Sequence, residues 1–562
     1  MTDKKLIIYQ MFPRLLTNMN STCEPFGSLE KNGSGKMNDI DLKLLRSIKA
    51  LGCNCVWYTG IIEHATKEAF DGIPADDPHV VKGQAGSPYA IKDYYDVSPE
   101  IAEDIPNRMA EFTSLVERTH KAGMMAVIDF VPNHTARRYH SDVAPTGIED
   151  FGSGDDTTKF FSPNNNYYYL TNQKFQPHFD IGNYTEFPAK ATGNDAYTAF
   201  PGEYDWYETV KLNYGHDPGN GYQQTDPVPD TWVKMLNILR FWASKGIDGF
   251  RCDMVFMVPL VFWNWAIPQV KKDYPHLIFI GEIYNVGLYR PFLDYCHFDY
   301  LYDKVNLYDT LVGIQTQSWS AAKLTDCWKT TDGIAPKMLN FLENHDEVRF
   351  GSQAYAGDPS KVVASLVVSA MFNTGPFMIY FGQELGERAT DDEGFAGNNN
   401  RTSIFDFWSY DTMHRWYDNG KCSVAKLTEK EKWLRRMYTK VLHLCNSEAS
   451  IYKGSFFDLM YVNLQNPDFS PHSQFAFIRH YGNESLIIVA NFAEQPCHVK
   501  INIPDEAFDM LNLPQGKAAC TELLTDYVKE KELMRGTPFA ASVAANGAVI
   551  WKIDHTKFSK PD

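Results

Sequence analysis

The chain has 562 residues, of which 44% are hydrophobic, 14% aromatic and 22% charged, and its formal net charge is −17. A single core stops growing at roughly 250–300 residues, so we expect two or three folded domains and no extensive disorder. A negative surface repels phosphate backbones and anionic lipids, which argues against nucleic acid and membranes as partners and is compatible with a neutral sugar.

The first apolar run, residues 6–12, predicts a β-strand. It ends at Pro13 and is too short for the apolar region of a secretory signal. The ten cysteines are scattered and form no C-x-x-C pair. Both features favour a cytoplasmic protein with reduced cysteines.

Short β-branched runs alternate with amphipathic windows over the first 450 residues. The predicted strands are 6–12, 53–59, 125–131, 247–253, 277–283, 298–303, 338–344 and 376–382. Helical windows between them include 109–123, 231–246 and 359–375, each ending at or near a glycine. This alternation is typical of an α/β fold with a parallel sheet. Eight strands favour a closed (β/α)8 TIM barrel, with a doubly wound open sheet as the alternative.

The connection after the third strand, residues 135–205, is too long for a structureless loop and predicts an inserted subdomain. It contains a group of aromatic residues, Phe160, Phe161, Tyr167, Tyr168 and Tyr169. These rings can form either the core of the insert or stacking platforms for sugar rings.

From about residue 450 the sequence changes to alternating apolar and polar residues. The runs at 475–481, 485–492, 498–504 and 548–553 predict an antiparallel β-sandwich. A helix at 428–447 marks the boundary before it. The predicted domains are a barrel of residues 1–134 and 206–449, an insert of residues 135–205 and a C-terminal sandwich of residues 450–562.

Four acidic residues fall where apolar runs end: Asp129, Asp253, Glu282 and Asp346. The active site of a βα barrel lies at the carboxyl ends of its strands, so these acids are expected to meet in one pocket. Retaining cleavage of a glycoside needs a carboxylate that attacks and a protonated carboxyl that donates, about 5–5.5 Å apart. Arg251, two residues before Asp253 on the same strand face, can hold Asp253 ionised.

The segments around these acids resemble the signature regions of the α-amylase family, glycoside hydrolase family 13. The four main matches are DFVPNH at 129–134, GFRCD at 249–253, GE at 281–282 and FLENHD at 341–346. VKLN at 210–213 is similar to a fifth region, and SPYAIKDYYDV at 87–97 to the segment whose tyrosine lines the subsite of the attacked sugar. The ordered set is specific and extends over essentially the whole chain.

The resemblance implies Asp253 as nucleophile, Glu282 as acid/base and Asp346 as a third acid that binds sugar hydroxyls and stabilises the transition state. The further residues that it places around the same glucose are Tyr89, Asp129, His134, Arg251 and His345. It implies an α-glucan or maltooligosaccharide as substrate and no cofactor for the chemistry.

The resemblance also makes Asn133 a candidate ligand of a structural Ca²⁺, although the family's histidine partner is missing and no acids of the insert are evident as further ligands. Many starch-degrading members carry Lys-His where this chain has Phe256 and Met257. This apolar pair favours short maltooligosaccharides or transfer between glucosides, or else it begins a core helix with Pro259.

Three functions are compatible with these residues. The first is retaining hydrolysis of α-1,4-glucosidic bonds in maltooligosaccharides or in starch- and glycogen-type glucans. The second is a transglycosidase or isomerase similar to trehalose synthase, which uses the same three acids and excludes water. The third, a non-catalytic sugar-binding relative, ranks last because such relatives usually lose these acids and this chain keeps all three.

Overall fold

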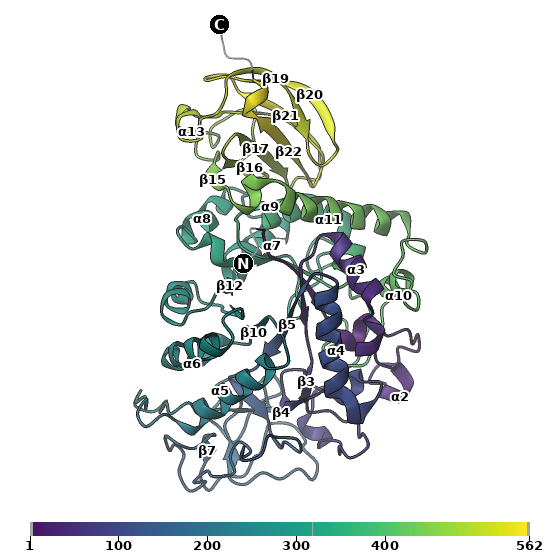
Figure 1. Cartoon of the computed structure of the whole chain (residues 1–562), viewed down its shortest axis with the longest axis vertical. Coiled ribbons are helices and arrows are strands. Elements are labelled where there is room, and N and C mark those ends of the chain that lie inside the picture. The colour runs from purple at the N-terminus through teal and green to yellow at the C-terminus, as the bar shows by residue number, and fades with distance from the viewer. Residues whose placement is uncertain (1–3, 317, 559–562) are drawn as a thin grey trace.

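Eight short apolar segments form parallel strands that close into a barrel (Figure 1). The computed structural model describes residues 4–316 and 318–558. The barrel order is β1-β14-β13-β12-β11-β10-β5-β2. Its strands are β1 (Ile7–Met11), β2 (Cys55–Tyr58), β5 (Met125–Phe130), β10 (Gly249–Cys252), β11 (Ile278–Gly281), β12 (Tyr300–Tyr302), β13 (Met338–Phe341) and β14 (Phe377–Tyr380). All eight lie within the predicted runs. Because β1 pairs with both β2 and β14, the open doubly wound sheet is excluded.

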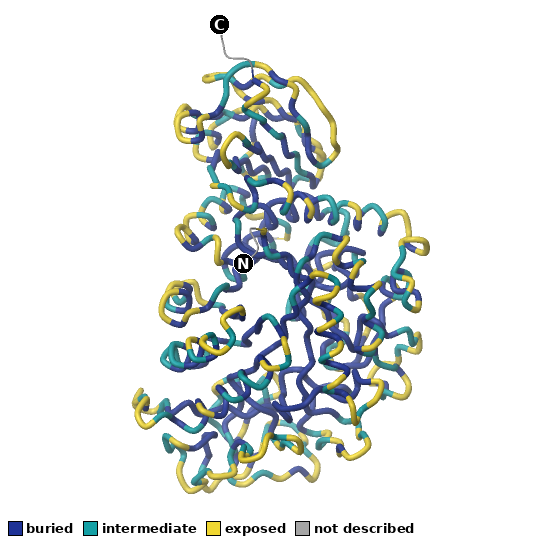
Figure 2. The backbone as a smooth tube through the Cα atoms, viewed as in Figure 1, coloured by how far each residue is buried: buried dark blue, intermediate teal, exposed yellow. Residues whose placement is uncertain are grey.

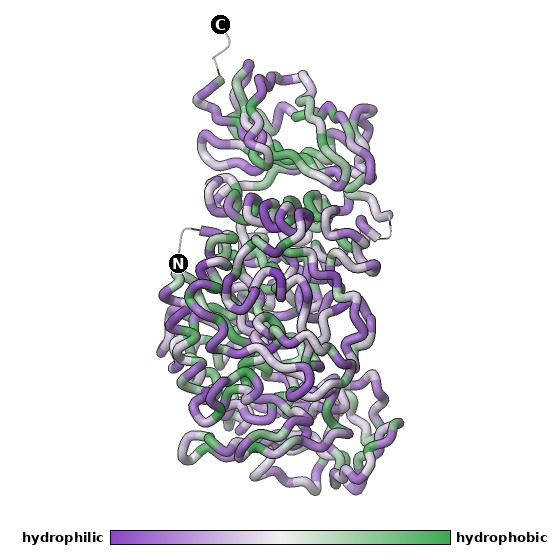
Figure 3. Tube along the Cα trace, turned by 90° about the vertical axis from the view of Figure 1, so that its right-hand side faces the viewer, coloured by the Kyte–Doolittle hydropathy of each residue, from purple (hydrophilic) through white to green (hydrophobic). Residues whose placement is uncertain are grey.

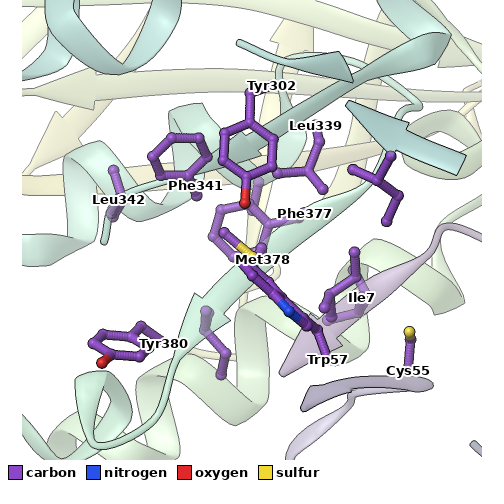
Figure 4. Packing of buried hydrophobic residues seen from close by; sticks show 14 of the residues in the cluster. Ile7, Cys55, Trp57, Tyr302, Leu339, Phe341, Leu342, Phe377, Met378 and Tyr380 are labelled. Carbon is purple, nitrogen blue, oxygen red and sulfur yellow. The ribbon is translucent and has the colours of Figure 1, made fainter. Parts of the chain in front are cut away.

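The barrel strands are apolar along nearly their whole length because both of their faces are covered. One face meets the barrel interior and the other meets the surrounding helices, so the strands form the most buried part of the domain (Figure 2). Figure 4 shows Trp57, Tyr302, Phe377 and Met378 gathered in this core. The packed interior leaves room for a site only at the ends of the strands.

Helices follow the strands and form the outer layer of the barrel. They are α3 (Leu42–Leu51), α4 (Arg108–Lys121), α5 (Asp230–Ala243), α6 (Leu260–Asp273), α7 (Asp309–Thr316), α8 (Lys323–Thr330), α9 (Val363–Met371) and α11 (Glu429–Ser447). Helix α11 begins with a capping box in which Thr428 and Glu431 satisfy each other's backbone N–H groups, as its sequence requires. The shorter α10 (Asp411–Tyr417) lies before it.

The long connection after β5 forms a small subdomain next to the carboxyl ends of the strands, and its strand pairing extends it to Lys211. Its strands pair as β6 (His134–Ala136) with β9 (Thr209–Lys211) and β7 (Tyr169–Leu170) with β8 (Ala189–Lys190). A separate hydrophobic cluster contains Tyr168 and Phe175, with Phe160 and Phe161 packed against it. Most of the aromatic residues therefore serve the core of the insert and are not stacking platforms.

The C-terminal strands form a two-layer antiparallel sandwich at the opposite end of the molecule from the insert (Figure 1). The larger sheet has the order β15 (Ser455–Asp458), β16 (Gln474–Tyr481), β17 (Glu484–Asn491), β22 (Gly547–Asp554), β19 (Gly516–Glu522) and β20 (Tyr527–Leu533). The smaller sheet pairs β18 (Cys497–Ile501) with β21 (Phe539–Val543). Figure 3 shows hydrophobic stretches of these strands inside the domain and toward the barrel helices, where β17 and β22 contact α9.

Two further observations concern the described part of the chain. None of its helices is long and apolar enough to cross a membrane. All ten cysteines are present as free thiols, most of them buried.

Candidate active site

The predicted acids converge at the carboxyl ends of the strands. Asp129 lies in β5, Asp253 and Glu282 directly follow β10 and β11, and Asp346 lies five residues after β13. A cavity of about 310 Å³ opens at this point, and Tyr89 is among its lining residues together with Asp253, Glu282 and Asp346. Three of the four predicted acids therefore line one cavity, and Asp129 lies behind it in contact with Arg251 and Tyr89.

Arg251 joins the two central carboxylates through a single buried guanidinium. Its Nη1 lies 2.9 Å from an Asp253 oxygen and its Nη2 lies 2.8 Å from a Glu282 oxygen. Nη1 also lies 3.4 Å from Asp129. Because one guanidinium touches both Asp253 and Glu282, their side chains face the same small volume from neighbouring strands.

The charges in this group do not balance, because one arginine faces three carboxylates. Burial and the charge of Glu282 raise the pKa of Asp253 well above its usual range. Arg251 opposes this shift, but burial and the charge of Glu282 outweigh it. The prediction that Arg251 keeps Asp253 ionised is therefore contradicted for the free site.

In addition to its ion pair with Arg251, Glu282 accepts hydrogen bonds from two groups. The hydroxyl of Tyr284 donates to Oε1 at 2.5 Å, and the backbone N–H of Met254 donates to Oε2 at 2.9 Å. Met254 has a positive φ of 42°, which turns its N–H toward β11 immediately after Asp253. The turn after one strand thereby orients the carboxyl of the next.

Replacing Tyr284 with phenylalanine is expected to move the basic limb of the pH dependence of kcat/KM to higher pH. The hydroxyl donates to Glu282, and a hydrogen bond donated to a carboxylate favours its charged form, so removing the hydroxyl favours the protonated acid. Tyr289→Phe is a matched control, because Tyr289 donates to Asp303 away from the cavity. An unchanged profile for Tyr284→Phe would contradict this role.

Asp346 is held by the histidine that precedes it. His345 Nε2 lies 2.9 Å from Asp346, and its Nδ1 lies 2.9 Å from the amide of Gln10 in β1. Burial opposes the charge of Asp346, but the interaction with His345 outweighs it and lowers the pKa of Asp346 to about 2. Asp346 therefore presents an ionised carboxylate, 40% exposed, to the cavity.

Tyr89 forms one wall of the cavity, and Asp129 supports Tyr89 from behind. The ring of Tyr89 stacks on His345 with centroids 5.1 Å apart, and its hydroxyl donates to Asp129 at 3.3 Å. Asp129 also accepts from the indole N–H of Trp57 at 3.0 Å. Asp129, Arg251 and His345 lie behind the residues that line the cavity, so they orient groups rather than face the cavity directly.

His134 lines the cavity as a neutral imidazole. Burial and the charge of Lys211 lower its pKa to about 3. The Lys211 ammonium donates to Asn133 Oδ1, which leaves the Asn133 amide nitrogen to donate to His134 Nδ1 at 3.1 Å. The His134 proton is therefore on Nε2, and the ring makes a further hydrogen bond to the backbone of Tyr89.

Several site residues were not found from the sequence. Tyr284 lies in the motif segment GEIY, two residues after Glu282. Because side chains alternate along an extended chain, this spacing could have placed Tyr284 on the same face as Glu282. Trp57 and Gln10 lie on predicted strands without an acidic neighbour to draw attention to them. Trp206 comes from the insert and packs against His134 with ring centroids 5.4 Å apart, a contact between distant segments that has no local signal.

Comparison with known proteins yields one family model and many similar chains. The model "Alpha amylase, catalytic domain" matches residues 22–453. "Alpha-amylase 2" of Dictyoglomus thermophilum is 21% identical over 503 residues, which are 88% of this chain and 70% of that protein. "Cyclomaltodextrinase" of Thermoanaerobacter pseudethanolicus is 21% identical over 525 residues, 91% of this chain and 74% of that protein.

Solved structures of similar fold also include α-amylases. The α-amylase from Geobacillus thermoleovorans, solved in complex with acarbose, aligns over 98% of both chains with a TM-score of 0.65 and 18% sequence identity. At this identity the likeness concerns the fold, and it includes both the barrel and the C-terminal region.

Proposed function

The chain belongs to the α-amylase family of glycoside hydrolases, and from this premise we propose that it cleaves α-1,4-glucosidic bonds of short maltooligosaccharides with retention of configuration. The observation that carries the proposal is the guanidinium of Arg251, which holds the carboxyls of Asp253 and Glu282 at 2.9 and 2.8 Å. Two carboxyls on neighbouring strands within reach of one arginine are compatible with the separation of about 5–5.5 Å that retention needs.

The first chemical step needs one proton, which Glu282 supplies. A glucoside in the cavity places its bridging oxygen beside Glu282, which donates the proton to that oxygen while an Asp253 oxygen attacks the anomeric carbon. The bond to the leaving sugar breaks and a bond from Asp253 to the anomeric carbon forms. The step therefore requires a protonated Glu282 and an ionised Asp253, so the bound substrate must offset the effects that raise the pKa of Asp253 in the free site.

The second step reverses the roles. Glu282, now a carboxylate, accepts a proton from water as the water oxygen attacks the anomeric carbon. The bond to Asp253 breaks and its carboxylate is restored. Two inversions give retention, and Glu282 again holds the proton at the end of the cycle.

The other site residues are proposed to bind the attacked sugar. Asp346, kept ionised by His345, accepts hydrogen bonds from sugar hydroxyls and opposes the positive charge that develops on the ring. Tyr89 offers an aromatic wall, and the neutral ring of His134 lines the cavity. Asp129 supports Tyr89 and Arg251 from behind.

The size of the cavity argues for a short substrate. Its volume of about 310 Å³ lies at the lower end for ligand sites, enough for roughly one or two sugar rings. The insert contributes Trp206 and Glu208 to the lining, and a later loop contributes Ile404 and Phe405. We therefore expect maltooligosaccharides to be better substrates than starch or glycogen.

In the corresponding assay, kcat/KM for maltotriose should exceed that for soluble starch, per chain end, by about tenfold or more. Trp206→Ala should narrow this difference because it removes the ring that the insert places over His134. Trp319→Ala, which changes an exposed tryptophan outside the cavity, is the control. Equal efficiency on both substrates in the unmodified protein would rule out the restriction.

Transfer between glucosides is the second candidate. The ring centroids of Phe256 and Tyr284 lie 6.1 Å apart, and Tyr284 contacts Glu282, so apolar surface beside this acid can limit the access of water to the covalent intermediate. Incubation with maltose distinguishes the two: hydrolysis increases the number of reducing ends, whereas transfer leaves the number of glycosidic bonds unchanged. The expected result is a net increase in reducing ends.

We also propose a cytoplasmic location. The ten free cysteines support it, because thiols persist in a reducing compartment. Fractionation of cells that express the protein tests this point.

A further inference from the structure

The ammonium of Lys211 is enclosed by oxygen atoms from three distant segments. It donates to the Asn133 side-chain oxygen after β5, lies 2.6 Å from an Asp195 oxygen in the insert, and donates to the Met257 carbonyl at 2.9 Å. The lysine side chain is only 7% exposed. Amide oxygens, carboxylates and backbone carbonyls are also the ligands that a hard cation such as Ca²⁺ binds in proteins.

These three oxygen atoms cannot bind calcium while the lysine ammonium lies between them. Calcium takes six to eight oxygens, so these three would form only part of its shell and, once the ammonium is removed, would bind it weakly with water as the remaining ligands. Only one carboxylate, Asp195, contacts this position, and the ammonium already occupies it. Among the residues that the structure describes, no group of three or more His, Cys, Asp or Glu side chains is arranged to hold a metal.

We propose that Lys211 is a built-in cation that takes the place of a structural calcium ion, and that the enzyme is therefore independent of calcium. Asn133, which the sequence marked as a candidate calcium ligand, binds the ammonium instead. The third oxygen belongs to the backbone carbonyl of residue 257. Having Met257 in place of the family's histidine therefore does not remove it.

The position of the ammonium connects it to the reacting groups on two sides. Met257 ends a short 3-10 turn (Val255–Met257), and its N–H donates to the carbonyl of Met254, whose own N–H donates to Glu282. On the other side, the orientation of Asn133 sets the tautomer of His134. Lys211 is thus a positioning residue that connects the insert, the turn after Asp253 and one wall of the cavity.

The test compares Lys211→Ala, which vacates the site, with Lys211→Met, which fills it without charge. The unmodified protein should keep its melting temperature and kcat in excess EDTA. Lys211→Ala should melt about 5 °C lower and lose about 10- to 100-fold in kcat, and millimolar Ca²⁺ should restore part of both. Lys211→Met should show the same decreases in melting temperature and kcat, and Ca²⁺ should restore neither.

Terbium luminescence gives a readout that does not depend on activity. A cavity of about 650 Å³ reaches Lys211 and Asp195 and is also lined by Tyr168, Tyr197 and Tyr214, which can sensitise a bound Tb³⁺. Sensitised emission that saturates and is displaced by Ca²⁺ is expected for Lys211→Ala alone. Lys190→Ala is the matched control, because Lys190 is a largely buried lysine of the insert that contacts the Arg137 carbonyl and not this oxygen group.

Three outcomes would overturn the proposal. The first is loss of stability or activity of the unmodified protein in EDTA with recovery in Ca²⁺, which would show that calcium binds despite the lysine. The second is a Lys211→Ala protein with unchanged melting temperature and kcat. The third is a Lys211→Ala protein that binds Tb³⁺ no better than the Lys190→Ala control.

Discussion

Asp253→Asn is expected to lower kcat on maltotriose by about 10⁴-fold or more, because the covalent intermediate cannot form without the carboxylate. At neutral pH the same change should raise the melting temperature. The carboxyl is buried beside Glu282, and its pKa is raised by that burial and by the neighbouring charge. A neutral amide of the same shape removes the repulsion and can keep the contact with Arg251.

The stability gain should depend on pH in a defined direction. The pKa of this carboxyl is higher in the folded state than in the unfolded state, where it is about 3.9. At pH values between the two pKa values, the folded state therefore binds more protons than the unfolded state. Its favourable contribution is complete below about pH 4 and decreases by up to about 1.4 kcal/mol per pH unit as pH rises toward the folded pKa. Asp253→Asn lacks this loss, so its advantage over the unmodified protein should be larger at pH 8 than at pH 5.

Thermal unfolding of the two proteins between pH 5 and pH 8 measures this difference. Asp303→Asn is a suitable control: Asp303 is buried and burial raises its pKa to about 7, but it does not line the cavity. It should change the pH dependence of stability in the same direction and leave kcat within a few-fold. A stability difference for Asp253→Asn that shrinks as pH rises would contradict the raised pKa of Asp253 in the folded protein.

Glu282→Gln is expected to lower kcat on maltotriose by about 10³-fold, the usual value of general acid catalysis. The loss should be much smaller on an α-glucoside of an acidic phenol, since such a leaving group departs without protonation. Hydrolysis of the covalent intermediate then becomes rate-limiting, and a burst of phenol precedes the steady state. Stopped-flow measurement of phenol release provides the comparison.

Azide separates the roles of the two acids through the configuration of the product. With Glu282→Ala, azide should attack the covalent intermediate and give the α-glucosyl azide, because two displacements retain configuration. With Asp253→Ala, azide should attack the substrate directly from the opposite face and give the β-anomer. The reverse pairing of anomers, read by NMR, would mean that the nucleophile and the acid have been exchanged.

The barrel could be predicted because its signal is local. Each barrel strand is a short apolar run covered on both faces, and each of Asp129, Asp253 and Glu282 lies within or directly after such a run. Since the carboxyl ends of parallel strands meet on one side of a barrel, strand positions alone bring these residues together. The short strand pairs of the insert, such as β7 with β8, have too few residues to leave a periodic pattern.

The chemical state of the site was decided by contacts between segments far apart in the chain. By itself, the sequence determined which residue types stand at the strand ends, because periodicity and turn signals act over a few residues. Only the tertiary structure decided that Arg251 contacts Glu282 as closely as Asp253, that Trp206 covers His134 and that Lys211 meets the carbonyl of Met257. Charge sharing, cavity size and the position of a buried ammonium depend on distances through space, and those distances exist only once the barrel has closed and the insert has packed against it.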